Sequence, residues 1–189
     1  MVEQVFYQIL KTFAFKCPYL IFGNNTIERL GVEVKKYGKK ILLVTDKGLI
    51  KAGLADKKVI PSLDKEDLDV DVFDEVETEP SVGCVGKVSE KVRNKSYDAV
   101  IGLGGGSSLD MAKTASFIAK TPGSVTDYMG KDKVKTKGLP LILVPTTAGT
   151  GSEVSPYIVL STAEAKKSIV SPLVMADVSI VDPLLTLSL

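Results

Sequence analysis

Three continuous apolar runs constrain the fold more than any other feature of this sequence. They are ILLVT at 41–45, AVIGL at 99–103 and LPLILV at 139–144. A strand with one solvated face alternates apolar and polar residues, whereas a strand of a parallel sheet is covered on both faces and reads as an unbroken apolar run. The runs therefore predict buried parallel strands in one sheet.

Segments with helical periodicity separate these runs. One helix is predicted before Gly38, where apolar residues recur at the spacing of one helix face; they are Ile27, Leu30, Val34 and Tyr37. Another is predicted from a second such set: Val82, Val85, Val88 and Val92. Residues 47–63 are predicted to be helical in pieces, and a further helix is expected to follow a glycine-rich turn and run to about Lys120.

Weaker strand signals complete the pattern. Residues 13–22 contain Pro18, which sheets tolerate mainly at an edge, so they predict two edge strands or a bent hairpin. Residues 64–79 carry nine carboxylates and alternate within 68–73, which favours an outer strand with a solvated acidic face over a cation site. Further β-like segments lie around 156–161 and 178–181.

The order of these elements predicts the fold class. Strands alternate with helices, so we expect an α/β fold with a doubly wound, mostly parallel, Rossmann-like sheet and an N-terminal edge hairpin. The 189 residues suit one domain, and a hydrophobic share of 44% is enough for a buried core. Residues 1–189 are therefore predicted to form a single α/β domain.

The absence of histidine excludes several kinds of chemistry. None of the 189 residues is histidine, which rules out Ser-His-Asp and Cys-His catalysis and removes the commonest metal ligand. The two cysteines, Cys17 and Cys84, lie far apart in the sequence and are expected to be isolated thiols. Catalysis, if present, must rest on other groups or on a cofactor.

Charge and hydropathy point to a protein that binds neither nucleic acid nor membranes. The formal net charge is +1, so no global field attracts a polyanion. No apolar run approaches the roughly eighteen residues that a membrane-spanning helix needs. Residues 1–15 include Glu3 and polar breaks, unlike a signal peptide. A cytoplasmic location is expected.

A glycine-rich turn between a strand and a helix predicts an anion site. Gly104, Gly105 and Gly106 can bring backbone close to a ligand, and the free amides and dipole of the following helix favour a pyrophosphate. Ser107 is expected to cap this helix, with Asp110 closing a capping box. The alternative is a tight βα turn that binds nothing. The pattern is neither the usual Rossmann fingerprint nor a P-loop.

A second polar loop, PTTAGTGSE at 145–153, also follows a buried strand. Ligands of open α/β sheets bind beyond the carboxyl ends of the strands, and hydroxyls with exposed amides suit a ribose or a phosphate. Taken alone, the loop could equally be a polar surface loop that binds no ligand. A carboxylate for the ribose is expected about twenty residues after the glycines, which indicates Asp127, but Asp46 also ends a buried strand. Spacing leaves both open.

Together the two loops resemble the iron-containing (group III) alcohol dehydrogenase family. The matching stretches follow the family's order: VTDKGL at 44–49, GGGSSLDMAK at 104–113, PTTAGTGSEVSP at 145–156 and VDPLLTLSL at 181–189. The resemblance covers nearly the whole chain and implies the nucleotide-binding half of such an enzyme, with a dehydroquinate synthase-like N-terminal fold. It implies NAD-dependent hydride transfer with an alcohol or aldehyde.

The resemblance also implies roles for individual residues. Asp46 corresponds to the acid at the adenosine ribose, which favours NAD over NADP. Lys167 occupies roughly the place of a lysine near the nicotinamide ribose. The expected pyrophosphate turn consists of Gly104, Gly105, Gly106, Ser107 and Asp110. The expected loop beside the pyrophosphate and nicotinamide consists of Thr146, Thr147, Thr150 and Ser152.

The family's iron or zinc is held by one Asp and three His in a helical C-terminal domain, which the resemblance places beyond residue 189. None of these ligands is present, so that domain is expected to be absent and the chain to be inactive alone. Three hypotheses remain: an oxidoreductase represented by its nucleotide-binding domain, a non-catalytic nucleotide-binding module, and a structural remnant acting through oligomerisation. A homodimer is expected, and a separate polypeptide could supply the second domain.

Overall fold

The three apolar runs form adjacent strands in the middle of a parallel sheet. The computed structural model describes residues 17–162 and 165–187. Its main sheet has six strands in the order β1-β9-β6-β4-β2-β3, and every neighbouring pair is parallel. The central strands are β2 (Lys40–Val44), β4 (Ala99–Gly104) and β6 (Leu141–Pro145). The predicted doubly wound α/β fold is confirmed.

The outer strands are shorter or more polar. The acidic segment forms β3 (Asp69–Phe73) at one edge, as predicted. The other edge is β1 (Tyr19–Phe22), which runs parallel to β9 (Val178–Val181) with Tyr19 opposite Val178. An edge strand was expected there, but residues 1–16 lie outside the described part of the chain, so the hairpin stays a prediction.

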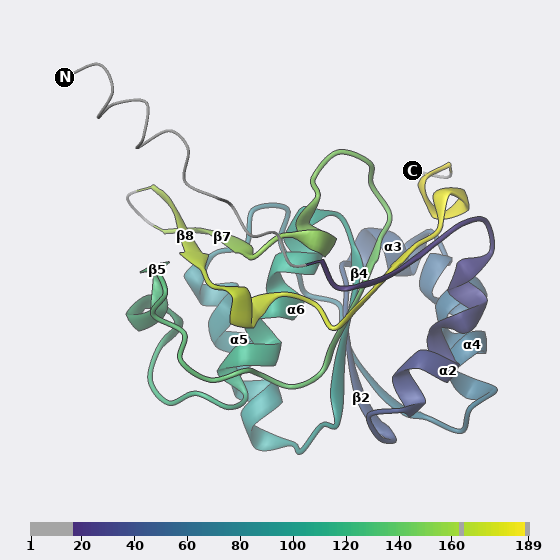
Figure 1. Cartoon of the computed structure of the whole chain (residues 1–189), viewed down its shortest axis with the longest axis horizontal. Coiled ribbons are helices and arrows are strands. Elements are labelled where there is room, and N and C mark those ends of the chain that lie inside the picture. Colours follow the sequence, from purple (N-terminus) through teal and green to yellow (C-terminus); the bar gives the residue numbers. More distant parts are fainter. Residues whose placement is uncertain (1–16, 163–164, 188–189) are drawn as a thin grey trace, which may run out of the picture.

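Helices cover both faces of this sheet (Figure 1). One face carries three short α-helices, one 3-10 helix and one π-helix. Those that follow β2 confirm the prediction that residues 47–63 are helical in pieces. The helices of this face are η1 (Thr26–Arg29), α2 (Leu30–Lys35), α3 (Lys47–Lys51), the π-helical η2 (Ala55–Val59) and α4 (Ile60–Asp64). The opposite face carries two longer helices, α5 (Val82–Asn94) and α6 (Gly106–Ile118).

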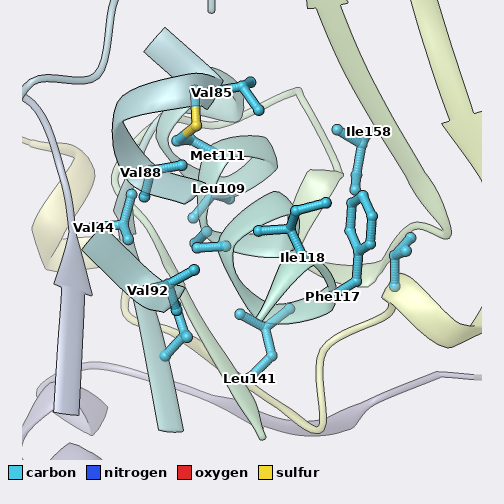
Figure 2. Close-up of a cluster of buried hydrophobic side chains, with 14 of the residues drawn as sticks. Val44, Val85, Val88, Val92, Leu109, Met111, Phe117, Ile118, Leu141 and Ile158 are labelled. Carbon is cyan, nitrogen blue, oxygen red and sulfur yellow. The ribbon is translucent and has the colours of Figure 1, made fainter. Parts of the chain in front are cut away.

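Alternation along each strand divides the interior into two cores. Successive strand residues point to opposite faces, so Leu42 and Val44 pack with α5 and α6, whereas Ile41 and Leu43 pack with α2 and α4. Figure 2 shows the first core, where valines of α5 meet Leu109 and Met111 of α6. Burial on both faces explains why the central strands read as continuous apolar runs.

A small second sheet packs against α6. Two antiparallel strands, β7 (Tyr157–Ser161) and β8 (Lys166–Val170), place Ile158 and Ile169 in the first core, and β5 (Gly130–Lys131) lies beside β8. The sequence predicted a β-like segment at 156–161 but not β5 or β8. The remaining 3-10 helices are η3 (Val125–Tyr128), η4 (Ser152–Val154), η5 (Pro172–Val174) and η6 (Pro183–Thr186).

Two expectations drawn from composition can be compared with the structure. Cys17 is exposed and Cys84 is buried, and both thiols are free, as predicted. Within residues 17–162 and 165–187, none of the helices has the length and apolar character that crossing a membrane requires.

Two helical glycines provide a test of the packing on either side of the sheet. A Cβ at Gly31 of α2 would lie 2.0 Å from the carbonyl oxygen of Ser62, whereas a Cβ at Gly86 of α5 would have no atom within 4 Å. We expect Gly31→Ala to lower the free energy of unfolding by about 1–3 kcal/mol through overpacking. Gly86→Ala should raise it by about 0.4–1 kcal/mol. Urea denaturation measures both, and a loss at Gly86 would contradict this packing.

Candidate functional site

A pocket lies at the carboxyl ends of the central strands. Its volume is about 650 Å³, and its lining includes Asp46 after β2, Gly105 after β4 and Thr146 after β6. From β2 the chain moves outward to β3 and then crosses to β4 on the other side of β2. The strand order reverses at this point, which is where open α/β sheets bind their ligands.

The glycine turn brings bare backbone to this pocket. Gly104 has a φ of +143°, and a Cβ there would lie 2.6 Å from Ser108 Oγ, so only glycine fits. Gly105 and Gly106 line the pocket at the start of α6, a helix of 13 residues. A Cβ on Gly105 would lie 3.4 Å from Thr147 Oγ1. A ligand can therefore approach the helix N-terminus closely, where free amides and the dipole favour an anion.

The capping box predicted for this helix is wrong. Gly105 is the N-cap of α6 and no side chain caps it. The helix begins two residues earlier than expected, so Ser107 stands within the first turn and its hydroxyl donates to the carbonyl oxygen of Thr78. Asp110 reaches the second polar loop instead. Ser107 still lines the pocket.

The second polar loop stands against the glycine turn. The amide of Thr146 donates to the carbonyl of Gly104 at 3.0 Å. Thr146 and Thr147 line the pocket, and the Thr150 methyl carbon is 3.3 Å from the position of a Cβ on Gly106. Thr146 is 1% exposed, and its hydroxyl has no partner among the described residues. A buried hydroxyl without a partner fits a site completed by a bound polar ligand.

The structure separates the two candidate carboxylates. Asp46 lines the pocket: its Oδ1 accepts from the amide of Leu49 at 3.1 Å, which caps α3, and its Oδ2 accepts from Ser108 Oγ at 3.3 Å. Asp127 accepts from the amide of Ser124 in a capping box at η3, and it is not part of the pocket lining. Of the two candidates, Asp46 is therefore the one at the pocket.

Two predicted site residues turn away from this pocket and meet a lysine that the sequence analysis missed. Asp110 accepts from Ser152 Oγ with one oxygen, at 2.5 Å, and from the amide of Val159 with the other, at 2.8 Å. Lys113 is fully buried and donates to Ser152 Oγ at 2.9 Å and to the carbonyl of Tyr157 at 2.7 Å.

Burial lowers the pKa of Lys113, and the charge of Asp110 acts in the opposite direction. The sequence signal was an Asp and a Lys three residues apart, which share a helix face. Asp110 and Lys113 lie in a stretch of α6 whose residues from Ser108 to Ile118 are all buried.

The predicted nicotinamide lysine lies on the small sheet. Lys167 of β8 pairs with Leu160 of β7 and does not line the pocket. Its neighbour Lys166 points to the opposite face, because side chains alternate along a strand. Lys166 lines a smaller adjoining cavity of about 200 Å³ with Gly106, and its Nζ lies 2.8 Å from Glu79 Oε1. The role given to Lys167 stays a prediction.

A metal-ligand cluster is absent from the described part of the chain. Across 17–162 and 165–187, no group of three or more His, Cys, Asp or Glu side chains could hold a metal ion. The full sequence has no histidine. The pocket itself presents glycine backbone, hydroxyls and the Asp46 carboxylate to a ligand.

Two curated relatives match most of the chain. Long-chain-alcohol dehydrogenase 1 of Geobacillus thermodenitrificans is 44% identical over 175 residues, which is 90% of this chain and 44% of that protein. The NAD-dependent methanol dehydrogenase of Bacillus methanolicus is 32% identical over 169 residues, which is 88% of this chain and 44% of that protein. The chain thus spans less than half the length of these relatives.

Structure and family comparisons agree with these relatives. An iron-containing alcohol dehydrogenase from Thermotoga maritima superposes with a TM-score of 0.85 at 38% identity, covering 94% of this chain and 50% of that one. The sequence model described as iron-containing alcohol dehydrogenase matches residues 18–183. The chain therefore belongs to the iron-containing alcohol dehydrogenase family.

Proposed function

We propose that residues 1–189 form a single domain that binds NAD for an oxidoreductase acting on an alcohol or aldehyde. One observation carries the proposal: the glycine turn, the second polar loop and Asp46 meet in one pocket at the switch point of a parallel sheet. The proposal agrees with the name of the NAD-dependent methanol dehydrogenase among the relatives.

The residues of the pocket divide the dinucleotide among them. The pyrophosphate lies against Gly105 and Gly106, where the α6 amides donate to it. The hydroxyl of Thr146 gains the partner that it lacks. Asp46 accepts from the hydroxyls of the adenosine ribose, as a carboxylate at this place in the sheet does. The bound nicotinamide supplies hydride transfer.

The charges of the pocket favour NAD over NADP. Asp46 and Glu77 are both among its lining residues, and each carries a negative charge. NADP carries an additional phosphate on the adenosine ribose, and like charges brought together are repelled. We therefore place NADP well behind NAD in affinity.

Asp46→Asn tests this preference. Asparagine caps helices as well as aspartate does, so the start of α3 should remain intact. The substitution removes the negative charge, and we expect the ratio of NADP to NAD affinity to rise by about tenfold, or about 1.4 kcal/mol. Fluorescence titration with NADH and NADPH measures the ratio. An unchanged ratio would mean that another group sets the preference.

Binding by the chain itself is the first test of the proposal. Calorimetric titration of the 189-residue chain with NAD should show saturable binding. The Gly105→Val variant described below serves as the matched control. No detectable heat at millimolar NAD would overturn the proposal.

We further propose that the 189-residue chain does not turn over alcohols by itself. No described cluster can hold the metal that polarises an alcohol oxygen, and histidine is absent from the sequence. A separate polypeptide carrying the metal domain would restore this function. NAD reduction with simple alcohols and added iron or zinc tests the statement, and robust turnover would refute it. NAD binding without turnover also describes the second candidate, a non-catalytic nucleotide-binding module.

A cytoplasmic homodimer completes the proposal. The edge strand β1 exposes Tyr19, Leu20 and Phe22, whose exposed fractions are 57%, 45% and 69%. An apolar edge strand of this kind favours pairing with another chain. Light scattering should give the mass of two chains, and a clean monomer would refute the dimer.

A further inference from the structure

A buried ion pair joins the glycine-turn helix to the second polar loop. Lys113 of α6 has no exposed surface, and its Nζ lies 3.5 Å from Asp110 Oδ1. The same Nζ donates to Ser152 Oγ and to the carbonyl of Tyr157, and Ser152 Oγ donates in turn to Asp110. The pair is thus satisfied by hydrogen bonds, as a buried charge must be.

The pair connects three elements that lie apart in the sequence. Asp110 and Lys113 belong to α6, Ser152 begins η4, and the amide of Val159 and the carbonyl of Tyr157 belong to β7. These contacts fix the end of the polar loop, where the chain turns from β6 toward the small sheet. Lys113 lines neither the main pocket nor the adjoining cavity, so it cannot touch a ligand there.

The loop between the two anchored ends has little support of its own. Its first end is held by the hydrogen bond from Thr146 to Gly104, and its last by Ser152. The residues from Thr147 to Thr150 are exposed, and Gly149 and Gly151 adopt positive φ values with open space around them. Where Thr147 and Thr150 stand relative to the glycine turn therefore depends on the two ends.

We propose that Lys113 is a positioning residue: through Ser152 it holds the second polar loop in place and thereby raises the affinity of the pocket for NAD. This inference rests on the proposed NAD function and adds to it the group that shapes the loop. The buried pair holds Ser152 in place, and Ser152 holds Thr147 and Thr150 over Gly105 and Gly106. Groups that orient the ligands of a metal site change its affinity by about 10–100-fold, and we expect an effect of the same order here.

A comparison of NAD with AMP tests the proposal. AMP reaches Asp46 and the glycine turn, whereas NAD extends further along the second loop. In the 189-residue chain, Lys113→Met should weaken NAD binding by about tenfold or more. It should weaken AMP binding by a smaller factor, because AMP places one phosphate at the glycine turn and has no nicotinamide half along the second loop. Calorimetry measures both dissociation constants, and circular dichroism confirms that the variant is folded.

Two further variants keep the test decisive. Ser152→Ala leaves the ion pair in place but cuts its link to the loop, so it should weaken NAD binding more than AMP binding even if Lys113→Met fails to fold. Val34→Ala lies in the buried face of α2, on the other side of the sheet, and serves as a stability control that leaves both affinities unchanged.

The outcomes separate the two proposals. Equal losses for NAD and AMP in the Lys113 and Ser152 variants, or no loss in either, would overturn the positioning role while leaving NAD binding intact. A loss of NAD affinity in Val34→Ala as large as in Lys113→Met would reduce the effect to general destabilisation and would also overturn it. Failure of the unmodified chain to bind NAD would overturn the proposed function and this inference with it.

Discussion

Gly105→Val should weaken NAD binding by more than about a hundredfold, or about 2.7 kcal/mol, while the chain stays folded. A Cβ at this position would lie 3.4 Å from Thr147 Oγ1, so the two additional methyl groups of valine occupy the space between the glycine turn and the second loop. This is where we place the pyrophosphate. The effect is the largest that we expect on binding from any single substitution in the chain.

The backbone at Gly105 makes this result specific. Its φ of −76° and ψ of −177° are extended and open to any residue, in contrast to the positive φ of Gly104. Loss of the glycine therefore causes no backbone strain, and an apolar N-cap in place of glycine lowers stability by only about 1 kcal/mol. Isothermal calorimetry and thermal unfolding on the same samples separate the two effects.

The Gly86→Ala variant provides the control for this experiment. Gly86 lies in α5 with open space around it and is not part of the main pocket, so NAD affinity should stay unchanged there. If Gly105→Val bound NAD as well as the unmodified chain, the ligand would not approach the glycine turn. The pocket at the switch point would then need another occupant.

The sequence predicted the parallel strands well because burial on both faces leaves a local trace. Residues 41–45 and 99–103 are apolar without interruption because helices cover each side of β2 and β4. The short strand β8 left no such trace. Its exposed Lys166 and Lys167 carry charge, and its pairing with β7 depends on a contact that no local pattern encodes.

The choice between Asp46 and Asp127 shows what the order of residues alone cannot supply. Asp46 ends an apolar run, whereas a rule based on spacing favours Asp127. Strand order distinguishes the two carboxylates, because β2 lies next to β4 in the sheet although β3 separates them in the sequence. The side chain that ends β2 therefore stands beside the glycine turn, whereas Asp127 caps a distant 3-10 helix.

The positions of Asp110 and Ser152 depend on burial. The motif predicts a row of groups facing the ligand, but α6 is buried from Ser108 to Ile118, so only its first residues reach the pocket. Ser107 faces the pocket, while Asp110 and Lys113 face inward and meet Ser152 from 39–42 residues further along the chain. A motif can therefore combine residues that bind a ligand with residues that hold those residues in place.

The largest change in stability that we expect comes from a substitution beside the small sheet. Phe117→Ala should lower the free energy of unfolding by about 3–5 kcal/mol. Phe117 is fully buried, and its ring meets the ring of Tyr128 edge-on, with centroids 5.5 Å apart and planes at 70°. Figure 2 shows the Phe117 side chain directed toward Ile158 of β7. The ring thus fills the space between α6, η3 and the small sheet.

Ile118→Val, at the next position of the same helix, is the matched control and should lower the free energy of unfolding by only about 0.5–1.5 kcal/mol. Urea denaturation followed by circular dichroism and by tyrosine fluorescence measures both variants. Coincident transitions would mean that the small sheet unfolds together with the main sheet. A loss below about 1 kcal/mol for Phe117→Ala would show that the small sheet collapses onto the cavity. In that case α6 would hold β7 through the hydrogen bonds of Lys113 with Tyr157 and of Asp110 with Val159 more than through this apolar contact.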